Sequence, residues 1–297
     1  MLSLHTNIAS LNTQSALSST QSGLTTSMTR LGTGYRINSA MDDAAGLQIA
    51  TRLDAQSRGM TVAMQNTQNA KSMLQTAEGA LNETSNILLR MKDLATQAAD
   101  ATASTADQTA MQAEYDQLGV ELNNIMKNTS FGGQALLGGS GTGTGTAAGK
   151  FGASVNFQIG AATAETMAYD GSTDLNAVDT KLSAATSTYT AGNVTTAGTE
   201  ISTASAANGS IQKLSDAIDA VSTLRSSFGA ASNRLDHVYN NLSNEVTNTK
   251  QAQSRIMDVD YATESANMTQ HQMLMQAGTA MLKQSGSMNS MVMSLLQ

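Results

Sequence analysis

Apolar residues recur at helical spacing over most of the chain. The most regular line repeats every seven residues from Leu53 to Ala95, and a line of smaller residues follows it three positions later, from Gln56 to Ala98. Two such lines, sustained over many turns, predict one long helix with a continuous packing seam. The residues expected to form this seam, on the first long helix and on a second one after residue 206, are Leu53, Met60, Leu74, Leu81, Leu88, Leu214, Val221, Phe228, Leu235 and Leu242.

Three further stretches repeat the pattern. Residues 111–125 predict a shorter amphipathic helix, and both ends of the chain predict terminal helices. The apolar anchors of the terminal helices are Leu4, Ile8, Leu11, Leu24, Leu31, Met268, Leu274, Met275, Met281, Leu282, Met288 and Leu295. On the last helix these anchors form two adjoining lines, a stripe wider than one partner helix covers. We therefore expect part of this stripe to contact another molecule.

The middle of the chain has a different texture. Residues 138–149 are almost entirely Gly, Thr, Ala and Ser, which predicts a loop. Apolar residues alternate with polar ones from Ala153 to Ile159, which predicts a half-exposed strand. Residues 171–209 contain few charges, and we expect surface excursions there with some short strand or helix.

Composition removes several classes of function. The net charge is −7 and only 3% of residues are aromatic, so the chain is poorly suited to bind nucleic acid. The absence of cysteine excludes thiolate nucleophiles, disulfides and thiolate metal sites. We expect no membrane partner, because no run of apolar residues is long enough to span a bilayer, and the first ten residues do not resemble a cleaved secretory signal.

Candidate catalytic motifs fail when tested individually. The glycine-rich run lacks the Gly-Lys-Ser/Thr end of a phosphate-binding loop, since Phe151 follows Lys150. The three histidines lie far apart, without the spacing of a zinc hydrolase. The acidic pairs at 42–43 and 258–260 precede helical stretches and are interpreted as helix caps. We expect no enzyme activity and no cofactor.

Several long motifs resemble the bacterial flagellins. Residues 30–46 read RLGTGYRINSAMDDAAG, which is similar to the N-terminal signature of that family. The similarity continues in EGALNE at 78–83, and it returns near the C-terminus in SRI at 254–256 and DYATE at 260–264. It covers about residues 1–139 and 206–297, and the middle of the chain matches nothing specific.

The resemblance implies a mainly α fold: a long antiparallel helical rod or coiled-coil bundle with a small β-hairpin region, plus a terminal two-helix coiled coil. The inner-core domain is expected from residues 1–43 and 256–297, and the helical rod domain from 44–137 and 206–255. A variable excursion is expected at 138–205.

The resemblance also implies the function. We expect a structural subunit, secreted to the cell exterior, that polymerises into the flagellar filament used for motility. The alternative is another secreted axial protein of the flagellum, such as a hook–filament junction protein. An enzyme remains a third class, because some flagellins carry a zinc-peptidase motif in the middle region; this chain has no histidine between residues 6 and 236.

Partners follow from the same resemblance. They are further copies of the chain, a flagellar export chaperone, the type III export apparatus, and the hook–filament junction and cap proteins. A host Toll-like receptor is a further expected partner, with contacts at Arg90, Leu94, Gln97 and Glu114. We also expect the chain ends, about 1–34 and 261–297, to fold only in the polymer, because a lone pair of helices cannot cover its apolar stripes.

Overall fold

The computed structural model describes residues 7–138, 149–191 and 197–295, with side chains undescribed at 191 and from 288 onward. The chain forms two compact units, which we describe separately. The terminal unit comprises Met1–Ser57 and Thr247–Gln297, and the central unit comprises Arg58–Val246. The loop predicted at 138–149 lies mostly outside the described residues.

Three long helices supply most of the central unit: α2 (Ala44–Ala98), α3 (Thr105–Asn128) and α6 (Ala204–Met257). Helix α3 begins with a capping box, in which the Ser104 hydroxyl accepts from the Asp107 backbone N–H while the Asp107 carboxylate accepts from the Ser104 N–H. Helices α2 and α6 are antiparallel, and Lys71 pairs with Asp236 across them at 2.7 Å.

Nine of the ten predicted seam residues lie in the core of the central unit. Each of the nine is at most 5% exposed; they are Met60, Leu74, Leu81, Leu88, Leu214, Val221, Phe228, Leu235 and Leu242. The tenth, Leu53, belongs to the terminal unit and is half-buried, and Gln56 beside it is exposed. The small residues of the second line, from Ala63 to Ala98, are also buried, so neighbouring helices approach closely along it.

Two small antiparallel hairpins follow α3. Strands β1 (Ser130–Phe131) and β2 (Gln134–Ala135) are joined by Gly132 and Gly133, whose φ angles of 58° and 79° fit a tight two-residue turn. Strand β3 (Val155–Gln158) pairs with β4 (Thr166–Tyr169) after a short 3-10 turn, η1 (Lys150–Gly152). The strand predicted within 153–159 is therefore confirmed.

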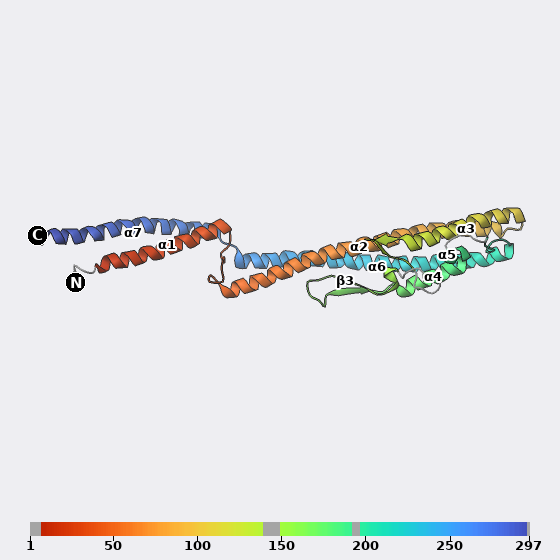
Figure 1. The fold of residues 1–297 in the computed structure, drawn as a ribbon, viewed down its shortest axis with the longest axis horizontal. Coiled ribbons are helices and arrows are strands. Elements are labelled where there is room, and N and C mark those ends of the chain that lie inside the picture. Colours follow the sequence, from red (N-terminus) through yellow and green to blue (C-terminus); the bar gives the residue numbers. More distant parts are fainter. Residues whose placement is uncertain (1–6, 139–148, 192–196, 296–297) are drawn as a thin grey trace. The chain divides into compact units, whose positions relative to one another are not determined.

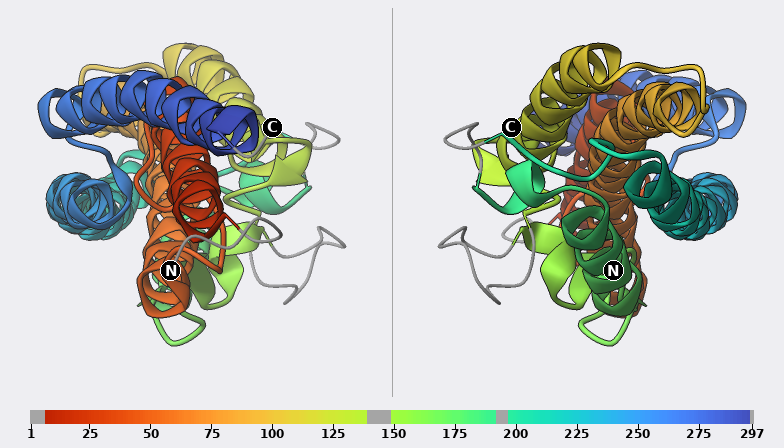
Figure 2. Two further views of the ribbon diagram at one scale, coloured as in Figure 1. Left: turned by 90° about the vertical axis from the view of Figure 1, so that its left-hand side faces the viewer. Right: turned by 90° about the vertical axis from the view of Figure 1, so that its right-hand side faces the viewer.

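At 171–209 the expected short helix is confirmed, but the expectation that the segment lies on the surface is wrong for the first half of that range. Helix α4 (Ser172–Ala185) buries Leu175, Val178 and Leu182 completely, and α5 (Ser187–Ala191) continues beyond it. The spacing of three and four residues between these side chains is the amphipathic signal that the polar texture concealed. Viewed along the helices, α2, α3, α4 and α6 lie around one interior (Figure 2).

An aromatic cluster joins the middle region to α6. Phe151 contacts Tyr169 edge-on with ring centroids 5.8 Å apart, and it contacts Phe228 of α6 at 4.8 Å. Phe228 and Tyr169 are 5.6 Å apart, and the Tyr169 hydroxyl lies 3.0 Å from the Ser227 hydroxyl. The middle region is thus part of the core of the central unit.

A buried amide holds the segment before α6 against α3. The Gln112 side-chain N–H group donates to Asp116 at 2.8 Å and to Glu200 at 2.9 Å, and its oxygen accepts from the Ile201 N–H at 2.7 Å. Burial alone raises the pKa of Glu200, but hydrogen bonds from Ser187 and Gln112 outweigh it and hold that pKa below its usual value. The ionised carboxylate therefore serves as the acceptor that fixes the segment.

The terminal unit contains α1 (Ile8–Thr33) and α7 (Tyr261–Leu295). The capping interpretation of the acidic pairs is confirmed for Asp43, which accepts from the Gly46 N–H at 2.9 Å, and for Asp260, which accepts from the Ala262 N–H at 3.0 Å. Asp42 instead closes the preceding loop by accepting from the backbone N–H groups of Asn38 and Ser39.

No helix in the described part of the chain is long and apolar enough to cross a membrane. The same residues contain no group of three or more His, Cys, Asp or Glu side chains placed to hold a metal ion.

Candidate assembly and interaction surfaces

Helices α1 and α7 pair in antiparallel fashion, as predicted (Figure 1). Asn7 caps the start of α1 by accepting from the Ser10 N–H at 3.0 Å. The Asn7 amide also donates to the Ser285 carbonyl oxygen of α7 at 3.1 Å. At the other end of the pair, Arg30 lies 3.7 Å from the Glu264 carboxylate. These two contacts fix the register of the helices.

Close approach of α1 and α7 depends on glycine. A Cβ at Gly23 would lie 2.7 Å from the His271 ring, and a Cβ at Gly278 would lie 3.2 Å from a Leu17 methyl group. The heptad lines did not reveal these positions, because glycine contributes nothing to a hydrophobic pattern. The only signal was the presence of glycines inside otherwise helical stretches.

The side chains buried between the terminal helices are polar. Ser27, Glu264 and Ser285 are at most 8% exposed, whereas no apolar residue of α1 or α7 with a described side chain is buried. The anchors Leu24 and Leu31 on α1, and Met268, Met275 and Leu282 on α7, are half-buried. The pair therefore excludes little apolar surface from water by itself.

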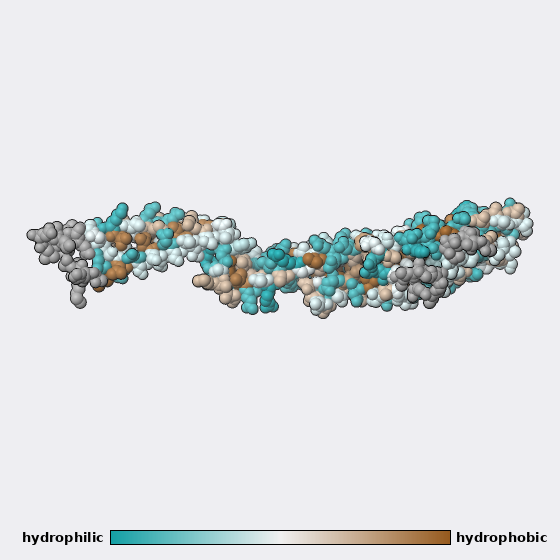
Figure 3. Space-filling view, viewed as in Figure 1, coloured by the Kyte–Doolittle hydropathy of each residue, from teal (hydrophilic) through white to brown (hydrophobic). Residues whose placement is uncertain are grey.

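Other predicted anchors are exposed. Ile8 and Leu11 on α1 are 61% and 55% exposed, and Leu274 and Met281 on α7 are 48% and 64% exposed. Apolar residues, drawn in brown, are visible on the outside of this helix pair (Figure 3). Leu4 and the side chains of Met288 and Leu295 lie outside the described residues. The line of α7 that contains Leu274 and Met281 is thus uncovered in the single subunit, whereas the line through Met268, Met275 and Leu282 is half-buried.

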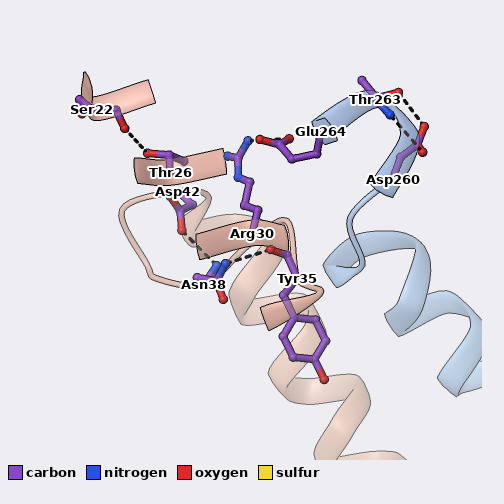
Figure 4. A network of polar contacts seen from close by, with 9 residues as sticks. All are labelled: Ser22, Thr26, Arg30, Tyr35, Asn38, Asp42, Asp260, Thr263 and Glu264. Atoms are coloured by element: carbon purple, nitrogen blue, oxygen red, sulfur yellow. Dashed lines mark hydrogen bonds and ion pairs between the residues drawn. The ribbon is translucent and has the colours of Figure 1, made fainter. Parts of the chain in front are cut away.

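A polar network organises the connection between α1 and α2 (Figure 4). The Asn38 amide donates to the Tyr35 carbonyl oxygen at 2.9 Å, and the Asn38 backbone N–H donates to Asp42 at 3.0 Å. Arg36 donates to the Ile256 carbonyl oxygen at 3.0 Å. Ile37, which lies between Arg36 and Asn38 in the chain, is buried, with 2% of its surface exposed. The 30–46 motif thus encodes a defined loop, whose acidic residues act as hydrogen-bond acceptors and helix caps.

The predicted receptor contacts gather where α2 meets α3. The Arg90 guanidinium donates to Glu114 at 2.7 and 2.9 Å, and about half of each side chain is exposed. Gln97 is exposed on α2. Leu94 is only 2% exposed and packs in the core, so it supports this surface from beneath. Arg90, Gln97 and Glu114 are the members of the set that a partner can reach.

Comparison with known proteins gives a consistent result. The model of the bacterial flagellin N-terminal helical region matches residues 4–142, and that of the C-terminal helical region matches residues 211–296. Flagellin B of Vibrio cholerae is 35% identical, with 99% of each chain covered. Polar flagellin C of Vibrio parahaemolyticus is 32% identical over the whole of both chains.

A solved structure described as that of a flagellar hook-associated protein from Vibrio parahaemolyticus shares the fold. Its TM-score is 0.54 at 16% identity, covering 73% of this chain and all of the other. Identity at that level shows fold alone, whereas the matches across the full chain are named flagellins. The hook–filament junction alternative is therefore not favoured, and the chain belongs to the bacterial flagellins, the structural subunits that form the filament of the bacterial flagellum.

Proposed function

We propose that the exposed apolar residues of α1 and α7 are the surface through which this subunit joins its neighbours in the filament. The observation that carries the proposal is the exposure of Ile8, Leu11, Leu274 and Met281 on a helix pair whose buried side chains are polar. Exposed apolar side chains at this density mark a surface that another molecule covers. In a homopolymer, that molecule is a further copy of the chain.

Replacing Leu274 tests this surface. Leu274→Asn removes an apolar side chain that the single subunit leaves half-exposed, so we expect the subunit to keep its helical content and to polymerise at least about tenfold more slowly. Seeded polymerisation of the purified subunit, followed by light scattering, measures the effect. Gln272→Asn, at an exposed polar position of the same helix, is the matched control. Normal polymerisation of Leu274→Asn would contradict the proposal.

The same surface accounts for the export partners. An apolar stripe that is buried only in the polymer is exposed to water before assembly and favours aggregation. An export chaperone bound to α7 would shield it until the subunit is exported. The subunit then passes through the type III export apparatus to the cell exterior and meets the hook–filament junction and cap proteins at the growing filament. The filament is extracellular in this scheme. As a structural subunit, the protein needs no catalytic residue for this function.

A host Toll-like receptor is a further proposed partner of the monomer. The pair formed by Arg90 and Glu114 supports this, because a half-exposed guanidinium held in one orientation is a common anchor in protein interfaces. The competing explanation is that the pair serves packing between subunits.

Removing the guanidinium separates the two explanations. Arg90→Ala is expected to lower activation of receptor-bearing cells by about tenfold or more, with little loss of stability because the ion pair is exposed. Lys127→Ala, which removes an exposed cation elsewhere on α3, is the control. Unchanged activation by Arg90→Ala, together with slower polymerisation, would assign the pair to subunit packing.

A further inference from the structure

A groove of about 260 Å³ lies in the central unit between α2 and the β3–β4 hairpin, away from the terminal helices. Nothing in the assembly scheme uses it. It is lined by four consecutive β3 residues, 155–158, and by Asn66, Asn69 and Met73 of α2. Phe131 and Lys150 also line it.

One edge of β3 is open along this groove. The Ile159 N–H donates to the Glu165 carbonyl oxygen at 3.0 Å, so the odd-numbered residues of this strand direct their backbone groups toward β4. The backbone groups of Asn156 and Gln158 therefore point away from β4. Within the described part of the chain, neither residue makes a backbone hydrogen bond to a segment outside the hairpin. The edge supplies donors and acceptors to the groove.

The groove also contains side-chain carboxamides. Asn66 and Asn69 are three residues apart on α2 and so share one face of the helix. Their amides, and that of Asn156, make no hydrogen bond to the described residues. The Gln158 amide, by contrast, is held by the carbonyl oxygens of Gly160 and Ala162 at 2.9 and 2.7 Å. Each free carboxamide offers both donors and an acceptor.

The lining selects a class of ligand. No carboxylate is among the described residues that line the groove, and Lys150 is its one charged side chain, so neither a metal ion nor a polyanion is well matched. Phe131 and Phe157 are half-buried and place phenyl surface beside the amides. Neutral donors and acceptors next to aromatic rings match a ligand with many hydroxyl groups and one apolar C–H face.

We propose that this groove binds the pyranose ring of a neutral sugar. The hydroxyl groups exchange hydrogen bonds with Asn66, Asn69 and the open edge of β3, and the C–H face of the ring lies on Phe157. The volume limits the site to about one sugar residue, so each groove binds weakly. A filament carries many identical grooves, and together they bind a multivalent glycan more tightly than one groove does. A free sugar and a sugar carried on a glycan present the same ring.

Methyl-methionine NMR of the full-length monomer tests the proposal. The probes are glucose, galactose, mannose and N-acetylglucosamine, with glycerol and glucuronate as controls. We expect at least one neutral sugar to shift the methyl signal of Met73, which lines the groove, with a saturable dependence on concentration. The signal of Met60, which is buried elsewhere in the central unit, serves as the internal control and should stay fixed. No shift with any of the four sugars, or an equal shift with glycerol, would overturn the proposal.

A variant pair assigns the shift to the groove. Asn69→Ala is expected to weaken sugar binding about fivefold, the loss of about one hydrogen bond, without loss of helical content. Asn82→Ala, at an exposed position of α2 outside the groove, should bind as the unsubstituted chain does. Equal affinities of the two variants would count against the site. A last measurement compares filaments and monomer on an immobilised glycan that carries the active sugar. Binding of filaments but not of monomer would identify a displayed glycan as the natural ligand. If the free sugar at the same concentration displaces the filaments as well as the glycan does, the ligand is a soluble sugar.

Discussion

Limited proteolysis of the monomer should cut the chain before about Ala44 and after about Arg255, whereas the same bonds should resist cleavage in the filament. The reason lies in the terminal unit. Among the side chains described on α1 and α7, Ser27, Glu264 and Ser285 are buried, and the apolar ones are half-buried or exposed. Ordering about seventy residues costs roughly 1–2 kcal/mol per residue in backbone entropy, which so little apolar burial does not offset.

Neighbouring subunits change this balance in the filament. We expect them to cover the exposed line of α7, which contains Leu274 and Met281, so that folding of the ends is coupled to assembly. A fragment of residues 45–254 is expected to stay helical, because the large core cluster lies entirely inside it. The fragment should fail to polymerise even with seeds. Equal protection of the ends in monomer and filament, or filaments grown from the fragment, would refute the coupling.

Phe228→Ala should destabilise the central unit by about 3–5 kcal/mol. Phe228 is 1% exposed and packs against Phe151 and Tyr169, with ring centroids 4.8 and 5.6 Å away. Truncation leaves a cavity at the point where the middle region joins α6, and it removes both ring contacts.

Urea denaturation followed by circular dichroism measures this loss. Because the terminal helices are expected to be disordered in the monomer, the main cooperative transition reports on the central unit. Tyr239→Ala, which removes a partly exposed ring from the same helix, is the matched control and should cost less than about 1 kcal/mol. A similar loss of stability in both variants would show that the aromatic cluster stabilises the central unit no more than a partly exposed ring does.

The long helices were predictable because their signal is local and repeated. The lines through Leu74, Leu81 and Leu88 on α2, and through Leu214, Val221 and Phe228 on α6, return every seven residues, and all six side chains are buried. The alternation at 153–159 likewise predicted β3, and the acidic residues before α2 and α7 predicted caps. Periodicity and capping depend on the nearest few residues, so the sequence alone contains them.

Contacts between distant segments were not predictable in this way. The burial of Leu175, Val178 and Leu182 was hidden because a single short helix among Ser, Thr and Ala gives a weak periodic signal. The hydrogen bond between the Gln112 amide and the Glu200 carboxylate joins residues 88 positions apart, and no local sequence pattern indicates such a pair.

The sequence by itself thus determined the long helices, the caps at Asp43 and Asp260 and the two lines of α7, because these depend on spacing within one element. The tertiary structure alone decided which apolar side chains of each helix are buried against a neighbouring helix and which stay exposed. It showed that Gly23 receives the His271 ring, that Leu94 faces the core while Arg90 is half-exposed, and that the line of α7 through Leu274 and Met281 is exposed. Burial is a property of the packed chain, because the same apolar spacing suits a core and an interface equally well.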